Sequence, residues 1–112
     1  MPEPRLSAGL WVAAYLRRLQ LADIPAYVTA KGDPTAGAVI VKCARLDGTA
    51  RAKARRYDPA TGARVWDVLA DGSEAEVDAS LARQRGFDPD VWVIEIESRD
   101  GCDLLDEPGL SE

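Results

Sequence analysis

The chain has 112 residues, of which 46% are hydrophobic and 29% are charged, and its formal net charge is −5. This length suits one folded domain, and this composition excludes a largely disordered chain. The longest apolar run, residues 8–16, is about half as long as a bilayer-spanning helix requires, so we expect no membrane association.

The first predicted element is a helix from Ser7 to about Leu21. Ser7 is a favourable N-cap residue, and apolar residues recur from Leu10 to Leu19 at spacings of three and four. The helix is apolar around most of its circumference, so we expect it to lie deep against a sheet. Pro25 prevents the helix from continuing, because proline cannot donate the next hydrogen bond.

Four strands are predicted next, over residues 26–31, 38–46, 49–57 and 63–69. Turn residues separate them, and Asp47-Gly48 between two extended runs is the strongest hairpin signal of the chain. An antiparallel meander is the simplest topology for these four strands. The second strand is β-branched on both faces, which is typical of a central strand.

A second helix is predicted from Ser73, which forms a capping box with Glu76, and a strand follows over residues 91–97. A short final strand over residues 102–105 is an option. The predicted fold is therefore α+β, a mostly antiparallel sheet of four to six strands with two helices, in the order α-β-β-β-β-α-β. We expect a single domain over residues 1–107 and a disordered C-terminal tail over residues 108–112.

Several of these segments carry a resemblance: Ala-Gly-Leu-Trp-Val at residues 8–12, Gly32-Asp33-Pro34 followed by Gly37-Ala38-Val39, the hairpin at residues 45–48, and residues 88–93 leading into Glu95-Ile96-Glu97. Over nearly the whole chain the pattern resembles a small bacterial family catalogued only as a domain of unknown function. The resemblance implies a single-domain cytoplasmic protein. It implies no activity, cofactor or site.

A basic stretch is the first candidate for function. Between positions 42 and 56 six residues are basic and Asp47 alone is acidic, and Arg51, Lys53 and Arg55 would share one face of their strand. Such a face suits phosphates or an acidic partner, while the alternative is a solvated face that protects a sheet edge from aggregation. Trp66 is either a core anchor or a surface stacking platform. The candidate interaction surface comprises Lys42, Arg45, Arg51, Lys53, Arg55 and Trp66.

The C-terminal part of the chain is acidic, with nine acidic residues from Asp88 onward against Arg99 alone. If Glu95 and Glu97 lie beside the basic strand, the two stretches neutralise each other as cross-strand pairs. If they face outward separately, the charges suit head-to-tail contact between molecules. The two carboxylates could also bind a metal, since residues two apart on a strand point to the same side.

Catalytic groups are scarce in this sequence. It contains no histidine, and Cys43 and Cys102 lack the paired spacing of a zinc or redox site, so we expect reduced thiols in a cytoplasmic protein. The element order loosely resembles the core of restriction-type nucleases, but Glu97 stands where their lysine should be.

The leading hypothesis is a non-catalytic cytoplasmic module, without a cofactor, that binds a macromolecular partner or its own copy through the basic sheet face. One alternative is a carboxylate-based, metal-dependent enzyme or small-molecule binder using Glu95 and Glu97. Another is a nucleic-acid binder using the same basic face, which the negative net charge disfavours.

Overall fold

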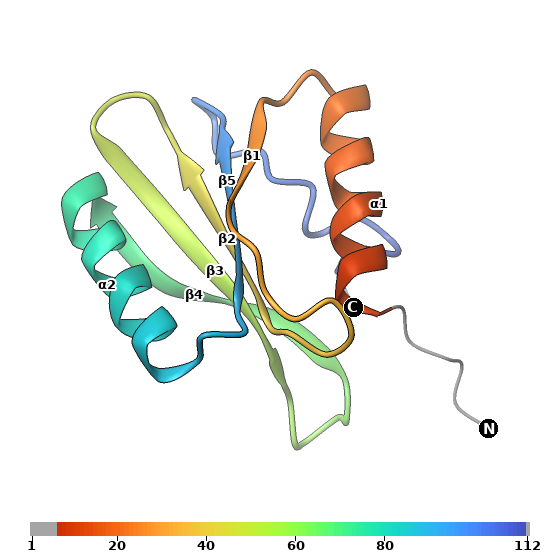
Figure 1. Cartoon of the computed structure of the whole chain (residues 1–112). Coiled ribbons are helices and arrows are strands. Elements are labelled where there is room, and N and C mark those ends of the chain that lie inside the picture. The colour runs from red at the N-terminus through yellow and green to blue at the C-terminus, as the bar shows by residue number, and fades with distance from the viewer. Residues whose placement is uncertain (1–6, 112) are drawn as a thin grey trace.

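The computed structural model describes residues 7–111. Along this part of the chain the elements are α1 (Ala8–Leu21), β1 (Ala26–Ala30), β2 (Val39–Ala44), β3 (Thr49–Tyr57), β4 (Arg64–Ser73), α2 (Glu74–Phe87) and β5 (Trp92–Glu97). Figure 1 shows the two helices on either side of one twisted sheet. The α+β class and the predicted order of elements are confirmed.

The order of strands in the sheet is β1-β5-β2-β3-β4, so the predicted four-strand meander is wrong at one place. The last strand, β5, lies between β1 and β2, antiparallel to β1 and parallel to β2. Strands β2, β3 and β4 form an antiparallel meander as expected. The physical reason lies in burial, because β5 has four buried residues to place inside the sheet, whereas β1 is mostly exposed and suits an edge.

The hairpin between β2 and β3 has a three-residue loop, Leu46, Asp47 and Gly48. Leu46 and Gly48 both adopt positive φ, at 64° and 88°, and the amide of Arg45 donates to the carbonyl of Thr49. A two-residue loop at Asp47-Gly48 would shift the register by one position. Such a shift moves every side chain of a strand to the other face, so this loop decides which residues share a surface.

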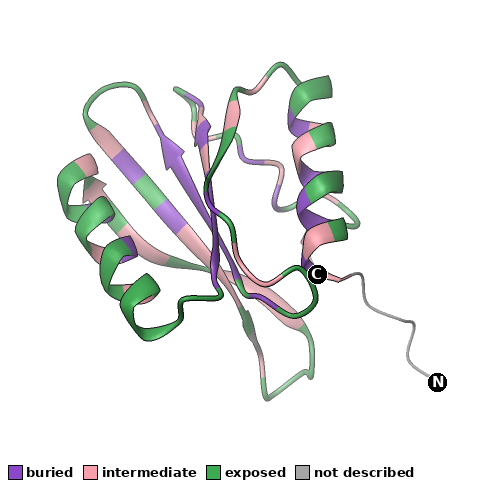
Figure 2. Cartoon of the chain, viewed as in Figure 1, coloured by how far each residue is buried: buried purple, intermediate pink, exposed green. Residues whose placement is uncertain are grey.

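Each helix covers its own face of the sheet. Trp11, Tyr15 and Leu19 of α1 pack into one cluster of buried residues with alternate positions of β2 and β5. Val77 and Leu81 of α2 pack into a second cluster on the opposite face. Figure 2 shows buried residues running through the central strands, while both helices turn exposed residues outward. Within residues 7–111, no helix meets the length and hydrophobicity that a membrane span requires.

The segment after β5 packs on the α1 side of the sheet. Leu105 and Leu110 are 2% and 1% exposed, and the Tyr15 hydroxyl donates to the Asp103 carbonyl. Residues 102–105, an optional strand in the sequence, form no strand here. The sequence predicts a disordered tail over residues 108–112, but Leu110 is buried because its apolar side chain completes the core under α1. Glu112 lies outside the described residues.

Candidate interaction surface

Three basic residues of β3 lie together on the α1 side of the sheet. Arg51 pairs with Cys43 and Lys53 with Val41, and these β2 residues belong to the cluster under α1. Arg55 follows two positions later on the same face. The sequence therefore placed these three side chains correctly relative to one another, and we call the surface that they form the basic face.

Acidic residues of the same chain neutralise much of the basic face. Asp71 accepts from Arg45 Nη2 at 2.7 Å and from Arg51 Nε at 3.0 Å, and these two guanidinium groups hold the pKa of Asp71 below its usual value. Lys53 Nζ lies 2.8 Å from Asp103 of the C-terminal segment. The neutralising carboxylates thus come from β4 and the C-terminal segment, rather than from Glu95 and Glu97.

Lys42 lies on the opposite face and is only 4% exposed, so it does not belong to the basic face. Its ammonium group lies within hydrogen-bond distance of three carboxylates, those of Glu74, Asp78 and Glu95. Burial alone would lower the pKa of Lys42, but these hydrogen bonds raise it well above its usual value. The three-residue hairpin loop explains the placement, because the register pairs Lys42 with Ala52 instead of Lys53.

Glu95 and Glu97 share the α2 side of the sheet, as two residues of one strand with an intervening residue must. Glu95 is engaged by Lys42 at 3.0 Å. Within residues 7–111 no group of three acidic, cysteine or histidine side chains is placed to hold a metal ion. Glu95 of this pair therefore contacts a lysine.

Arg55 is held against two tryptophans. Its Cζ lies 5.1 Å from the ring centroid of Trp11 and 5.8 Å from that of Trp66, distances at which a guanidinium group is attracted to an aromatic face. Trp66 is itself fixed, because its indole Nε1 donates to the carbonyl of Leu110 at 2.9 Å. Trp66 is therefore anchored between the core and Arg55, and the guanidinium group of Arg55 is oriented in advance.

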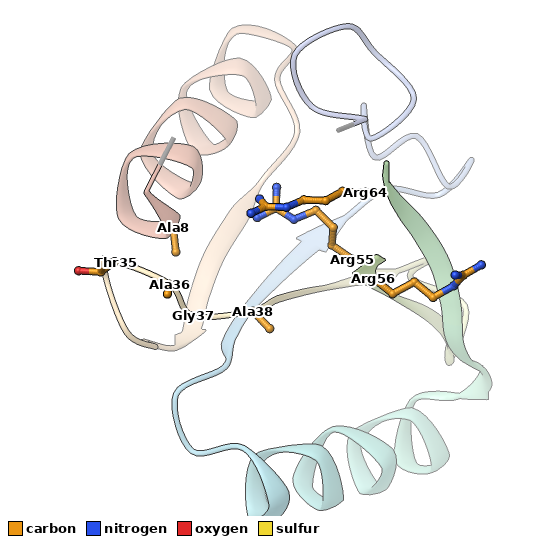
Figure 3. A pocket seen from close by; sticks show the side chains of 8 residues that line it. All are labelled: Ala8, Thr35, Ala36, Gly37, Ala38, Arg55, Arg56 and Arg64. Atoms are coloured by element: carbon orange, nitrogen blue, oxygen red, sulfur yellow. The ribbon is translucent and has the colours of Figure 1, made fainter. Parts of the chain in front are cut away.

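A cavity of about 170 Å³ lies at this end of the basic face. Figure 3 shows Arg55 and Arg64 directing their guanidinium groups to the same side, while Arg56 points away. Arg56 instead contacts the carboxylate of Asp67. The lining residues are Ala8, Thr35, Ala36, Gly37, Ala38, Arg55, Arg56 and Arg64.

Arg64 was not among the residues that the sequence singled out for function. The sheet register explains its position, because Arg55 pairs with Trp66 and Arg64 lies two residues before Trp66 on the same face of β4. Arg55 and Arg64 are therefore diagonal neighbours, a relationship that brings long side chains within reach of each other. The Arg64-x-Trp66 spacing was visible in the sequence, but its partner on β3 depended on the β3–β4 register.

The opposite wall of the cavity is fixed by hydrogen bonds. The first two amides of α1 donate to loop carbonyls, Ala8 to Thr35 and Gly9 to Pro34, so the loop is attached to the start of the helix. At Gly37 the loop closely approaches the turn that precedes β5, because a Cβ atom there would lie 2.6 Å from the carbonyl oxygen of Asp90. The cavity thus has a preformed wall of small residues facing two arginines.

Comparison with known proteins gives a consistent result. The family described as protein of unknown function, DUF1491, matches residues 6–106. A crystal structure of a DUF1491 family protein from Caulobacter crescentus CB15 is 43% identical, with a TM-score of 0.83 over 93% of this chain and 98% of that chain.

Two structures determined in solution are also similar. The NMR structure of a DUF1491 family protein from Caulobacter crescentus CB15 is 42% identical, with a TM-score of 0.81 over 95% of this chain and 97% of that chain. A protein from A. tumefaciens is 32% identical, with a TM-score of 0.72 over 85% of this chain and 87% of that chain. No protein with a curated description matches the chain.

Proposed function

Because the chain belongs to DUF1491, a family of proteins of unknown function, we propose its function from its own surface: a small non-catalytic cytoplasmic module that binds a macromolecular partner. The binding surface is one end of the basic face, formed by Arg55, Arg64, Trp66 and the cavity beside them. We call this surface the cationic end.

One observation carries the proposal: Arg55 is oriented by Trp11 and Trp66 and lines the same cavity as Arg64. Two guanidinium groups directed at one cavity create a positive potential there, and arginine held on an aromatic ring is a common anchor of protein interfaces. Arg51 and Lys53 of the basic face are paired with acidic residues of this chain. What distinguishes the cationic end is the orientation of Arg55 on two aromatic rings.

The two other hypotheses from the sequence receive less support. A metal-dependent enzyme would use Glu95 and Glu97, yet Glu95 is hydrogen bonded to Lys42. A nucleic acid presents a row of phosphates and would need several cations in line. Arg51 and Lys53 are already paired with acidic residues of this chain, and the whole chain carries a net charge of −5.

The test is affinity capture of the tagged protein from its own cell lysate at low salt, with nuclease added. We expect at least one protein to be retained by the unchanged chain and lost from Arg64→Glu. Arg17→Glu is the matched control, because Arg17 is exposed on α1 and bonds to Gln20 of the same helix. An identical set of captured proteins with Arg64→Glu and with the unchanged chain would reject the proposal.

A further inference from the structure

We propose that the chain forms a two-fold homodimer in which β1 pairs, antiparallel, with β1 of a second copy. The interface is the open edge of the sheet at β1, the first strand in the order β1-β5-β2-β3-β4. This edge lies at the other end of the strand order from β4, which carries Arg64 and Trp66 of the cationic end. The homodimer is therefore a second property of the chain and does not depend on the proposed function.

β1 presents unpaired backbone groups along this edge. The carbonyl of Pro25 accepts from the amide of Glu97, so the backbone groups of Pro25 point towards β5. Because these directions alternate along a strand, the groups of Tyr27 also point towards β5, whereas those of Ala26 and Val28 point outward. Within residues 7–111 no strand other than β5 borders β1, and neither Ala26 nor Val28 enters a loop or cap hydrogen bond. Their N–H and C=O groups are thus available to a further strand.

The other edge strand, β4, is protected in a way that β1 is not. β4 carries the charged residues Arg64, Asp67 and Asp71, and charges on an edge strand oppose association between sheets. β1 has the sequence Ala-Tyr-Val-Thr-Ala, which contains no charge. Tyr27 and Val28 are 53% and 42% exposed, and the register shift of β1 lies beyond Val28. The first half of β1 is therefore a regular, uncharged and accessible edge.

This edge is complementary to itself. In an antiparallel pair centred on Tyr27, Ala26 lies opposite Val28 of the second copy, and such pairs exchange both of their N–H···O bonds. The small side chain of Ala26 leaves room for that of Val28. Tyr27 meets Tyr27 of the second copy, an aromatic cross-strand pair of the kind that stabilises sheets. A pair centred on Ala26 or Val28 would match only one of these two residues, with its own copy, so the register centred on Tyr27 uses the most outward groups.

The same arrangement matches two charged side chains, Arg85 of α2 and Glu97 of β5, neither of which forms an ion pair within residues 7–111. Arg85 and Thr29 line one cavity of about 260 Å³. In the proposed register Thr29 faces Pro25 of the second copy, and Pro25 borders Glu97. Arg85 and Glu97 of the second copy are thus two strand spacings apart, about 10 Å, a span that these two long side chains bridge together.

This charge complementarity favours a second copy of the chain over a strand of an unrelated protein. Both members of the ion pair come from this chain, and the two-fold axis forms the pair twice. The resulting interface is isologous, so it closes on itself and does not propagate into a fibre.

The experiment is sedimentation velocity of the full chain at low salt over a wide range of concentration. We expect the mass to rise from one chain to two. Arg85→Glu should weaken association about tenfold, because it turns two attractive contacts into repulsive ones, and adding Glu97→Arg to it should restore association. Arg83→Glu is the matched control, since Arg83 is exposed on the same helix and the change in net charge is the same. It should leave association unchanged.

Cysteine substitution in a Cys102→Ser chain tests the register. Directly opposite residues that exchange no hydrogen bonds have Cα atoms about 4.5 Å apart, which suits a disulfide, so Tyr27→Cys should give a covalent dimer on air oxidation. Val28→Cys is the matched control at the neighbouring exposed residue. In the proposed register the Val28 Cα atoms of the two copies lie more than about 7 Å apart, too far for a disulfide.

Thermal unfolding of each variant checks that the fold is kept. A mass of one chain at every concentration would overturn the homodimer, and so would equal cross-linking of Tyr27→Cys and Val28→Cys. An Arg85→Glu variant that associates as well as Arg83→Glu would also contradict the arrangement. Arg64→Glu, which tests the cationic end, should leave the association of two copies unchanged, so the two proposals can fail separately.

Discussion

Lys42 and Glu95 lie directly opposite each other on the parallel strands β2 and β5, with Lys42 Nζ 3.0 Å from Glu95 Oε1. The same ammonium group contacts Glu74 and Asp78 of α2. One buried cation therefore links two central strands to the helix that covers them. The three carboxylates carry more negative charge than the single ammonium group carries positive charge, so the arrangement depends on Lys42.

Replacing Lys42 by methionine should destabilise the protein. The change leaves three carboxylates facing one another without a cation, and breaking a buried pair typically costs ~3–5 kcal/mol. Solvent screens these acids in part, because their side chains are 29–58% exposed, so we expect the free energy of unfolding to fall by about 2 kcal/mol. Urea denaturation measures the effect, with Lys31→Met at an exposed position as control. Equal stability of the two variants would show that the cluster does not hold α2 in place.

Stability should decrease at alkaline pH. Burial, with the nearby Asp103, raises the pKa of the Tyr15 hydroxyl well above its usual value, and the pKa of Lys42 is also raised. The unfolded chain therefore releases these protons from about pH 10 while the native state keeps them, and the free energy of unfolding declines as pH rises further. Urea denaturation at pH 8, 10 and 11 tests this, and Tyr15→Phe should reduce the decline. A stability that is flat up to pH 11 contradicts the expectation.

Leu110 should contribute to stability as a core residue although it lies near the end of the chain. It is 1% exposed, and truncating a buried leucine to alanine costs ~2–5 kcal/mol. Leu110→Ala should therefore lower the thermal midpoint clearly, whereas Leu21→Ala, at a residue that is 69% exposed, should change it little. A Leu110→Ala variant as stable as the unchanged chain would mean that the C-terminal segment is not part of the core.

The two thiols should react at very different rates. Cys102 is exposed, while Cys43 is buried and burial raises the pKa of its thiol. Because the thiolate is the reactive form, a disulfide reagent should modify one thiol quickly in the native protein and the second only after unfolding. The absorbance of the thiolate released from the reagent counts the thiols modified in the fast and the slow phase. Cys102→Ser should remove the fast phase. Rapid reaction of two thiols per chain in the native state would contradict the burial of Cys43.

Local signals in the sequence predicted local structure well. Ser7 and Ser73 cap the two helices as expected, each accepting a hydrogen bond from an amide of the first turn. The meander failed at β5 because turn residues specify which strands follow each other, whereas the place of β5 depends on burial across the sheet. Long-range pairing of this kind leaves no short motif to read.

The candidate surface was predicted in part, and the error has a specific cause. The odd positions of β3 share a face as alternation requires, so Arg51, Lys53 and Arg55 were grouped correctly. Lys42 was grouped with them, but the extra loop residue, Leu46, turns it to the other side. The convergence of Arg64 on Arg55 could not be predicted, because it depends on the register between β3 and β4.

The position of β5 has a consequence for synthesis of the protein. β1 pairs with β5, and β2 borders β5 as well, so the centre of the sheet stays open until residues 92–97 have left the ribosome. Leu105 and Leu110 complete the core still later. Non-local pairings of this kind slow folding, because distant parts of the chain must meet before either is stabilised. The sheet therefore cannot be completed strand by strand in chain order, and a chain truncated shortly before β5 should lack the strand that joins β1 to β2.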